Sequence, residues 1–142
     1  MPVGAYSQSK VAYGLFGLEL DRRSRACGSI SANLAHPGVA PTNLLAARPE
    51  IGRTEAMPAR RMITALSRLG ITGTVTSAGL PALMAATTPG DQGGKFFGPN
   101  GVGGAGGRPA EQKLSSPLRS PEDARRMWDL TQQLTAVPLS TA

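Results

Sequence analysis

The chain has 142 residues, 40% of them hydrophobic and 17% charged, a balance typical of a globular domain rather than of a disordered chain. Its formal charge of +6 is spread over dispersed pairs of arginines, and only three Phe, two Tyr and one Trp are present for stacking, so we expect no nucleic-acid partner. No apolar run approaches the roughly 18 residues that span a bilayer, and the start of the chain lacks the pattern of a signal peptide, which predicts a cytoplasmic protein with no membrane span.

Cysteine and histidine each occur once, and this limits the chemistry that they can carry. Cys27 cannot form an internal disulfide, and with His36 as the only histidine there is no Cys/His cluster, so we expect no metal site. His36 invites a catalytic interpretation, but it precedes a proline and has no partner acid, so we interpret it as a loop residue. Cys27 is interpreted as a small residue at a helix end.

A long helix is predicted from Gly4 to about Arg25. Val11, Leu15 and Leu18 fall at positions i, i+4 and i+7, which places them on one apolar stripe. Gly28 then supplies a C-cap. Two ion pairs in the favourable i, i+4 order support the same helix, Glu19 with Arg23 and Asp21 with Arg25.

The next segment, Ser29–Ala35, alternates apolar and polar side chains and predicts a short strand, which Pro37 and Gly38 end sharply. Helix, strand and Gly/Pro turn in this order belong to α/β folds, whose ligands lie at the carboxyl ends of parallel strands. The loop that begins at His36 is therefore where a ligand is expected.

Two further helices are predicted in the middle of the chain. Residues Pro58 to Leu69 have a helical pattern that Gly70 stops. Thr72 to Thr87 has a helical pattern too, which Pro81 should kink or interrupt. The apolar face of the first of these helices consists of Met62, Leu66 and Leu69.

Glycine and proline crowd into residues 89–120, which we expect to be mostly loop, with Lys95–Phe97 as a candidate short strand. Within it, the stretch from Gly101 to Gly106 satisfies the dinucleotide fingerprint G-x-G-x-x-G. That fingerprint must open a helix so that the helix N-terminus faces phosphate, whereas residues 107–109 continue a loop. We therefore interpret the stretch as a glycine loop and not as a nucleotide site.

The last helix has a complete set of start signals. Ser120 is the expected N-cap, Pro121 stands at the first helical position, and Glu122 and Asp123 lie in the first turn. Its apolar face is predicted to consist of Met127, Leu130 and Leu134.

Tyr6 and Lys10 stand four positions apart near the start of the long helix, so both side chains emerge on one face. A neighbouring ammonium group favours the charged form of a phenol, which makes such a pair usable in acid/base chemistry. The same spacing also occurs by chance on many helices, and the alternative interpretation is two polar residues on the surface of a packed helix.

Two motifs in order and one pattern near the C-terminus give the pair a context. Tyr6-Ser7-Gln8-Ser9-Lys10, followed by a strand and then by residues 36–42 (His-Pro-Gly-Val-Ala-Pro-Thr), resembles the active-site half of the short-chain dehydrogenase/reductases. Residues 94–99 (Gly-Lys-Phe-Phe-Gly-Pro) and 120–123 (Ser-Pro-Glu-Asp) are similar to the C-terminal pattern of the retinol-dehydrogenase-like branch of that family. The resemblance covers nearly the whole chain.

The resemblance implies a fold and a set of roles. The fold class is α/β, the C-terminal half of a Rossmann-type doubly wound parallel sheet over residues 1–142. The residue matching Tyr6 exchanges a proton with an alcohol or carbonyl oxygen of a small-molecule substrate, and the residue matching Lys10 holds the nicotinamide ribose of NAD or NADP. The backbone of Pro37, Gly38 and Val39 and the Thr42 hydroxyl are expected to meet the nicotinamide, which supplies the hydride.

The sequence also departs from the family pattern. Only five residues precede Tyr6, so the Gly-rich turn that binds pyrophosphate and a catalytic serine have no counterparts, and we expect this isolated chain neither to bind the cofactor nor to turn over substrate. Unpaired strand edges and uncovered helix faces predict a homo-oligomer or a complementing N-terminal half as partner. A non-catalytic remnant or binding subunit of the same fold remains the alternative function.

Overall fold

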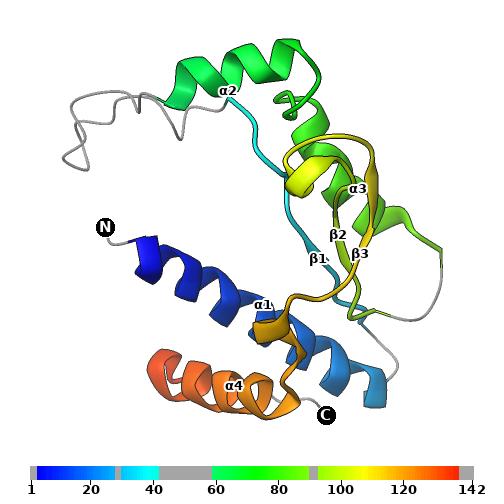
Figure 1. Cartoon of the computed structure of the whole chain (residues 1–142). Helices are drawn as coiled ribbons and strands as arrows, with labels where there is room; N and C mark the ends of the chain where they lie inside the picture. The colour runs from blue at the N-terminus through cyan, green and yellow to red at the C-terminus, as the bar shows by residue number, and fades with distance from the viewer. Residues whose placement is uncertain (1–2, 28–29, 42–58, 90–92, 138–142) are drawn as a thin grey trace. The chain divides into compact units, whose positions relative to one another are not determined.

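The computed structural model describes residues 3–27, 30–41, 59–89 and 93–137, and it contains α-helices and a three-stranded sheet (Figure 1). These elements confirm the α/β fold class in its general form. The chain divides into two compact units. Unit 1 comprises residues 1–34, 88–96 and 113–142, and unit 2 comprises residues 35–87 and 97–112.

Two helices form the core of unit 1. Helix α1 (Val3–Cys27) confirms the predicted long helix, and α4 (Pro121–Thr135) lies beside it (Figure 1). The Phe16 ring of α1 stacks on Trp128 of α4, with ring centroids 5.1 Å apart and planes inclined by 11°. Trp128 is completely buried. This aromatic stack is the centre of the contact between the two helices.

Helix α4 begins as predicted, but it buries a different face. The Ser120 hydroxyl oxygen accepts a hydrogen bond from the Asp123 amide at 3.1 Å, the expected N-cap. The predicted apolar face was wrong, because Leu130 and Leu134 are exposed while Ala124 and Trp128 are buried. Trp128 offers far more apolar area than a leucine, and its stacking on α1 turns the helix onto that side.

Two carboxylates near the end of α1 are almost completely buried. Glu19 accepts hydrogen bonds from Arg22 and Arg23, both at 2.7 Å from their Nε atoms. Asp21 pairs with Arg25 and accepts the backbone N–H of Ala32 at 3.0 Å. The predicted ion pairs are therefore present, with buried carboxylates and partly exposed arginines, and Asp21 also binds the backbone that follows the helix.

The sheet has the order β1-β2-β3 and is mixed. β1 (Leu34–Ala35) and β2 (Phe96–Pro99) are parallel, since Leu34 N–H donates to Lys95 O and His36 N–H donates to Phe97 O. The antiparallel β3 (Pro109–Gln112) was not predicted, and it corrects the expectation of a wholly parallel sheet. The strand candidate at Lys95–Phe97 is confirmed as β2, shifted by one to two residues.

β1 is shorter than the predicted strand Ser29–Ala35 because side chains take over the bonds that a longer ladder would use. The Ala32 N–H donates to the Asp21 carboxylate, and the Lys95 N–H donates to the Asn33 side chain at 3.1 Å. Residues 28 and 29, and with them the expected C-cap at Gly28, lie outside the described part.

In unit 2, α2 (Ala59–Arg68) confirms the helix predicted to start at Pro58, which itself lies outside the described residues. The helical pattern of Thr72–Thr87 was only half right, because the α-helix α3 spans Leu80–Thr87 and follows a turn and the 3₁₀ helix η3 (Ser77–Gly79). Pro81 stands at the second position of α3, where its missing N–H costs no intrahelical bond. The proline therefore starts this helix and does not kink it.

The glycine-rich stretch is more regular than predicted. Within residues 89–120, which we expected to be mostly loop, the structure contains β2, η4 (Val102–Gly104), β3 and η5 (Ser116–Arg119). β2 and β3 form a hairpin in which Gly101 N–H donates to Gly106 O at 2.8 Å and Asn100 N–H to Arg108 O at 2.9 Å. Gly103 and Gly104 at its tip have φ of 61° and 66°, which glycine adopts without strain.

Candidate functional site

Tyr6 and Lys10 lie one turn apart on the first half of α1, as the sequence predicts. The Lys10 Nζ is 5.3 Å from the centroid of the Tyr6 ring, over its face, within the range of a cation–π contact. Both side chains are exposed, Tyr6 to 53%. The pair is thus a surface feature of unit 1 that a ligand can reach.

The backbone around the pair is that of a regular helix. The Ser9 hydroxyl donates to the Tyr6 carbonyl oxygen at 2.8 Å and so turns back onto the helix. The first turn of α1 contains no acidic residue, so no carboxylate of that turn competes for the Lys10 ammonium. Tyr13, two turns after Tyr6 on the same helix, is 75% exposed and has no cation over its ring among the described residues.

The Gly/Pro loop expected to hold a ligand belongs to unit 2. Gly38 has φ of 74°, and a Cβ there would be 2.7 Å from Pro99 Cγ and 2.8 Å from Ala105 O. The loop thus needs glycine for two reasons, its left-handed backbone and the close approach of the hairpin. The Val39 N–H donates to Ala105 O at 2.8 Å, and the Val39 carbonyl accepts from Gly73 N–H at 2.9 Å.

His36 packs at the start of this loop as a structural residue, in line with its interpretation from sequence. Its Nδ1 accepts the Gly38 N–H at 3.2 Å, and its ring lies against Gly98, where a Cβ would overlap it. Partial burial lowers the pKa of His36 below its ordinary value of 6.5, because the charged imidazolium would lose hydration. His36 is therefore favoured in its neutral form.

The predicted site residues fall into two groups. Tyr6 and Lys10 come together on α1 in unit 1, while Pro37, Gly38 and Val39 come together in unit 2. Thr42 lies outside the described residues.

The fit of these groups to a nicotinamide cofactor can be tested on their backbone and side chains. The exposed Tyr6 and Lys10 side chains offer a phenol and an ammonium on one face, a donor set suited to ribose hydroxyls. The Val39 N–H and carbonyl oxygen are both hydrogen-bonded within unit 2, to Ala105 and Gly73, which leaves the partly exposed Val39 side chain for a ligand. The glycine stretch 101–106 connects two strands and opens no α-helix, which confirms that it lacks the setting of a dinucleotide fingerprint.

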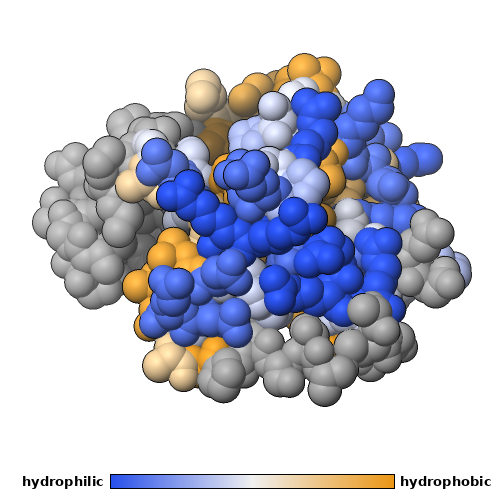
Figure 2. All heavy atoms as spheres, turned by 90° about the horizontal axis from the view of Figure 1, so that it is seen from below, coloured by the Kyte–Doolittle hydropathy of each residue, from blue (hydrophilic) through white to orange (hydrophobic). Residues whose placement is uncertain are grey.

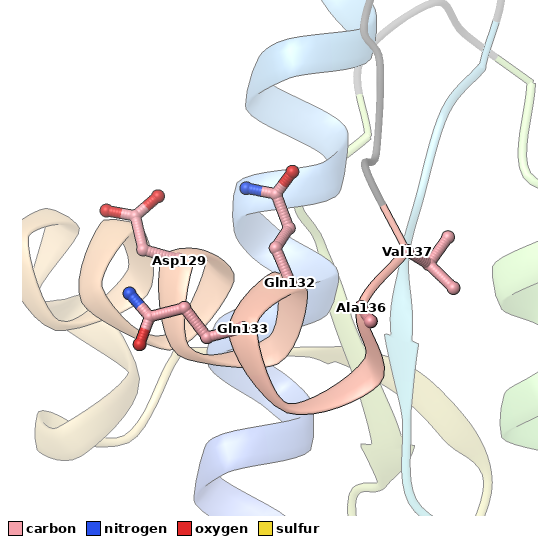
Figure 3. A pocket seen from close by; sticks show the side chains of 5 residues that line it. All are labelled: Asp129, Gln132, Gln133, Ala136 and Val137. Carbon is pink, nitrogen blue, oxygen red and sulfur yellow. The ribbon is translucent and has the colours of Figure 1, made fainter.

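Three other questions about the described residues bear on function: whether they form a metal site, a membrane-spanning helix or a further hollow. No group of three or more His, Cys, Asp or Glu side chains there could hold a metal ion, and no helix of the described part is long and apolar enough to cross a membrane. A wide hollow of about 540 Å³ lies at the end of α4 (Figure 3). It is lined by Asp129, Gln132, Gln133, Ala136 and Val137.

This hollow is an open surface of one helix end. Its three polar side chains leave α4 in different directions and do not converge on a common point (Figure 3). The surface on the side of α4 is largely hydrophilic (Figure 2). We therefore assign no ligand site to the end of α4.

The sequence did not predict the contacts that Asp21 and Arg25 make with Gly93. A Cβ at Gly93 would overlap the Asp21 carboxylate, and the Gly93 carbonyl accepts a hydrogen bond from Arg25 at 3.2 Å. The pairing of Asp21 with Arg25 was visible as an i, i+4 spacing, but no local pattern could link it to a glycine 72 positions away, since only the fold brings these residues together.

No family model matches the chain, and no curated protein matches it. Among solved structures, the chain is similar to the crystal structure of an uncharacterized protein from Mycobacterium Paratuberculosis, with a TM-score of 0.61 and 28% sequence identity. The match covers 96% of this chain and 40% of the other. The chain thus spans about two fifths of the length of that solved protein and shares its fold over this part.

Proposed function

We propose that this chain carries the proton-transfer residues of an NAD(P)-dependent oxidoreductase of the short-chain dehydrogenase/reductase type, acting on an alcohol or a carbonyl compound. The observation that supports it most directly is the Tyr6–Lys10 pair, exposed on one face of α1 with the ammonium 5.3 Å from the ring centroid. The bound nicotinamide would supply or accept the hydride.

In this proposal Tyr6 is the general acid/base. Its hydroxyl donates a proton to the carbonyl oxygen during reduction and takes the proton from the alcohol during oxidation. Lys10 holds the ribose hydroxyls, with its ammonium group over the face of the Tyr6 ring. The turn at Pro37–Val39 would contact the nicotinamide, and Gly38 sets the shape of this turn through its left-handed backbone and its close approach to the hairpin.

A second function is favoured by one observation. The Val39 N–H is hydrogen-bonded to Ala105 O, so one backbone donor that a nicotinamide could use is occupied. A binding subunit that has the fold without turnover would have no need of that donor. The chain spans about two fifths of its solved relative, so the activity of a whole protein is a proposal for either function.

The test uses the protein tagged and purified from its own cells, so that any complementing polypeptide is retained. Oxidation of primary and secondary alcohols with NAD or NADP is followed by the absorbance of the reduced nicotinamide. Tyr6→Phe removes only the hydroxyl and keeps the ring under Lys10, so kcat should fall about 10²–10⁴-fold while cofactor affinity is retained. Lys10→Met should lower both kcat and cofactor affinity.

The chain offers a matched control for each substitution. Tyr13→Phe removes the hydroxyl of the other tyrosine on the same helix, and Lys113→Met removes an exposed lysine elsewhere in unit 1. Both should keep kcat within about threefold of the parent protein. Absence of turnover in the purified protein, or an equal loss in Tyr6→Phe and Tyr13→Phe, would argue for the binding subunit instead.

A further inference from the structure

Helix α2 separates its residues sharply by polarity. On a helical projection its aliphatic side chains and its arginines occupy opposite arcs. Ile63 and Leu66 lie on the partly buried side, but Met62, on the same apolar arc, is 60% exposed. The half of the helix that faces solvent therefore combines aliphatic and basic side chains.

The turn after α2 extends this exposed apolar area. The Ile71 N–H donates to Leu66 O at 2.9 Å, and the Thr72 hydroxyl donates to Ile63 O at 3.1 Å, so the turn is fixed against the helix. Leu69 and Ile71 nevertheless remain 73% and 50% exposed. Their exposure is thus a property of a hydrogen-bonded turn and not of a loose end.

The charge beside these aliphatic groups has one sign. Arg61 and Arg68 are exposed on α2 and flank a shallow hollow of about 270 Å³, which Thr64 and Ala65 complete. Within the described residues neither arginine forms an ion pair. The sequence from residue 59 to residue 87 contains no Asp or Glu, so nothing in this segment neutralises them.

We propose that this surface docks on an anionic lipid bilayer. The surface, called here the α2 face, consists of Arg61, Met62, Arg68, Leu69 and Ile71. A bilayer offers headgroup phosphates to the guanidinium groups and, a few ångströms deeper, hydrocarbon to the aliphatic side chains, which is how amphipathic helices with basic polar faces bind. The α2 face contains no aromatic residue on which a nucleic-acid base could stack.

The proposal does not depend on the oxidoreductase function, since it uses none of the residues of that site. Vesicle co-sedimentation tests it with the full chain and two kinds of vesicle, phosphatidylcholine alone and phosphatidylcholine mixed with phosphatidylglycerol. Binding should be confined to the phosphatidylglycerol vesicles and should weaken as salt is added, because the headgroup attraction is screened.

Substitutions on the α2 face can be compared with matched control substitutions elsewhere in unit 2. Arg61→Gln and Arg68→Gln should each lower the partition coefficient about fivefold, and Leu69→Ser about tenfold. The controls are Arg108→Gln and Val102→Ser, which remove an exposed arginine and the 89% exposed valine at the hairpin tip. Both controls should bind within about twofold of the parent chain, and circular dichroism checks that every variant is folded.

Three results would overturn the proposal. Equal binding to neutral and anionic vesicles would show that the arginines do not contribute to binding. Equal losses of vesicle binding in the control variants would show that the α2 face is not the binding surface. Saturable binding of an acidic peptide without any vesicle binding would show that a protein is the occupant of this surface.

Discussion

Large side chains make the contact between α1 and α4 in unit 1, whereas close backbone approach makes the contacts of Gly38 and Gly106 in unit 2. Between α1 and α4, the Phe16 and Trp128 rings stack, and Arg23 lies over the Trp128 ring at 4.8 Å from its centroid. In unit 2, Gly38 and Gly106 allow backbone segments to meet at distances that a Cβ would block. We therefore expect the contact between α1 and α4 to fail when a side chain is removed, and the contacts at Gly38 and Gly106 to fail when one is added.

The largest effect should come from truncating the centre of the contact between α1 and α4. Trp128→Ala should lower the free energy of unfolding by about 3–5 kcal/mol, because it removes a completely buried side chain and leaves a cavity. Leu134→Ala, on the same helix but 76% exposed, should cost little. Chemical denaturation followed by circular dichroism measures both, since Trp128 is the only tryptophan and its fluorescence is lost.

Trp128→Phe separates the contribution of the stacked ring from that of the indole N–H. The buried indole N–H has no hydrogen-bond partner within the described residues, so its removal costs no bond, while the stack on Phe16 can be kept. The loss should be well below that of Trp128→Ala. A loss as large as for alanine would show that the N–H is satisfied in solution.

In unit 2 a large effect is expected from the addition of one methyl group. Gly106→Ala would place a Cβ 2.7 Å from Thr72 C and 2.8 Å from Gly73 N, both backbone atoms that cannot rotate away. We expect a loss of about 1–3 kcal/mol in the free energy of unfolding. Gly79→Ala, with open space around it, should be neutral or slightly stabilising, and similar losses at both glycines would contradict the comparison.

Gly98→Ala should show a smaller effect that a second substitution relieves. The new methyl would meet the His36 ring, a side chain and not backbone. His36→Ala opens that space, so the double variant should lose less stability than the sum of the two single variants. Additive losses in a double-mutant cycle would show that the ring moves aside in the single variant.

The smallest effect concerns the buried carboxylate of unit 1. The hydrogen bond from Arg22, with a further one from Arg23, lowers the pKa of Glu19 below its ordinary value of 4.5. The folded chain therefore binds the proton less readily than the unfolded chain, so this stabilisation is complete above about pH 4.5 and is lost as the pH falls through the lower folded value. Denaturation at a series of acidic pH values should show it, and Glu19→Gln should flatten that part of the profile.

The sequence alone was sufficient to predict the local structure of several segments of this protein. The helix predicted from Gly4 to about Arg25 is present as Val3–Cys27, and the last helix begins at Pro121 as predicted. The turn at Gly38 and the i, i+4 placement of Tyr6 and Lys10 are also present, and all of these features depend on neighbours within a few positions. Short-range periodicity and capping are sufficient for such features, because their causes lie within one or two helical turns.

The tertiary structure decided the features that depend on contacts between residues far apart in sequence. It set the buried face of α4 by the stacking of Trp128 and converted the glycine-rich stretch into a hairpin. It also placed Asp21 against the backbone of Ala32. The buried face of α4 has no local cause, because it depends on Phe16, which is distant in sequence and lies beside Trp128 only once the two helices have packed. The hairpin is closed by residues five to eight positions apart, but its pairing with β1 again needs a segment distant in sequence.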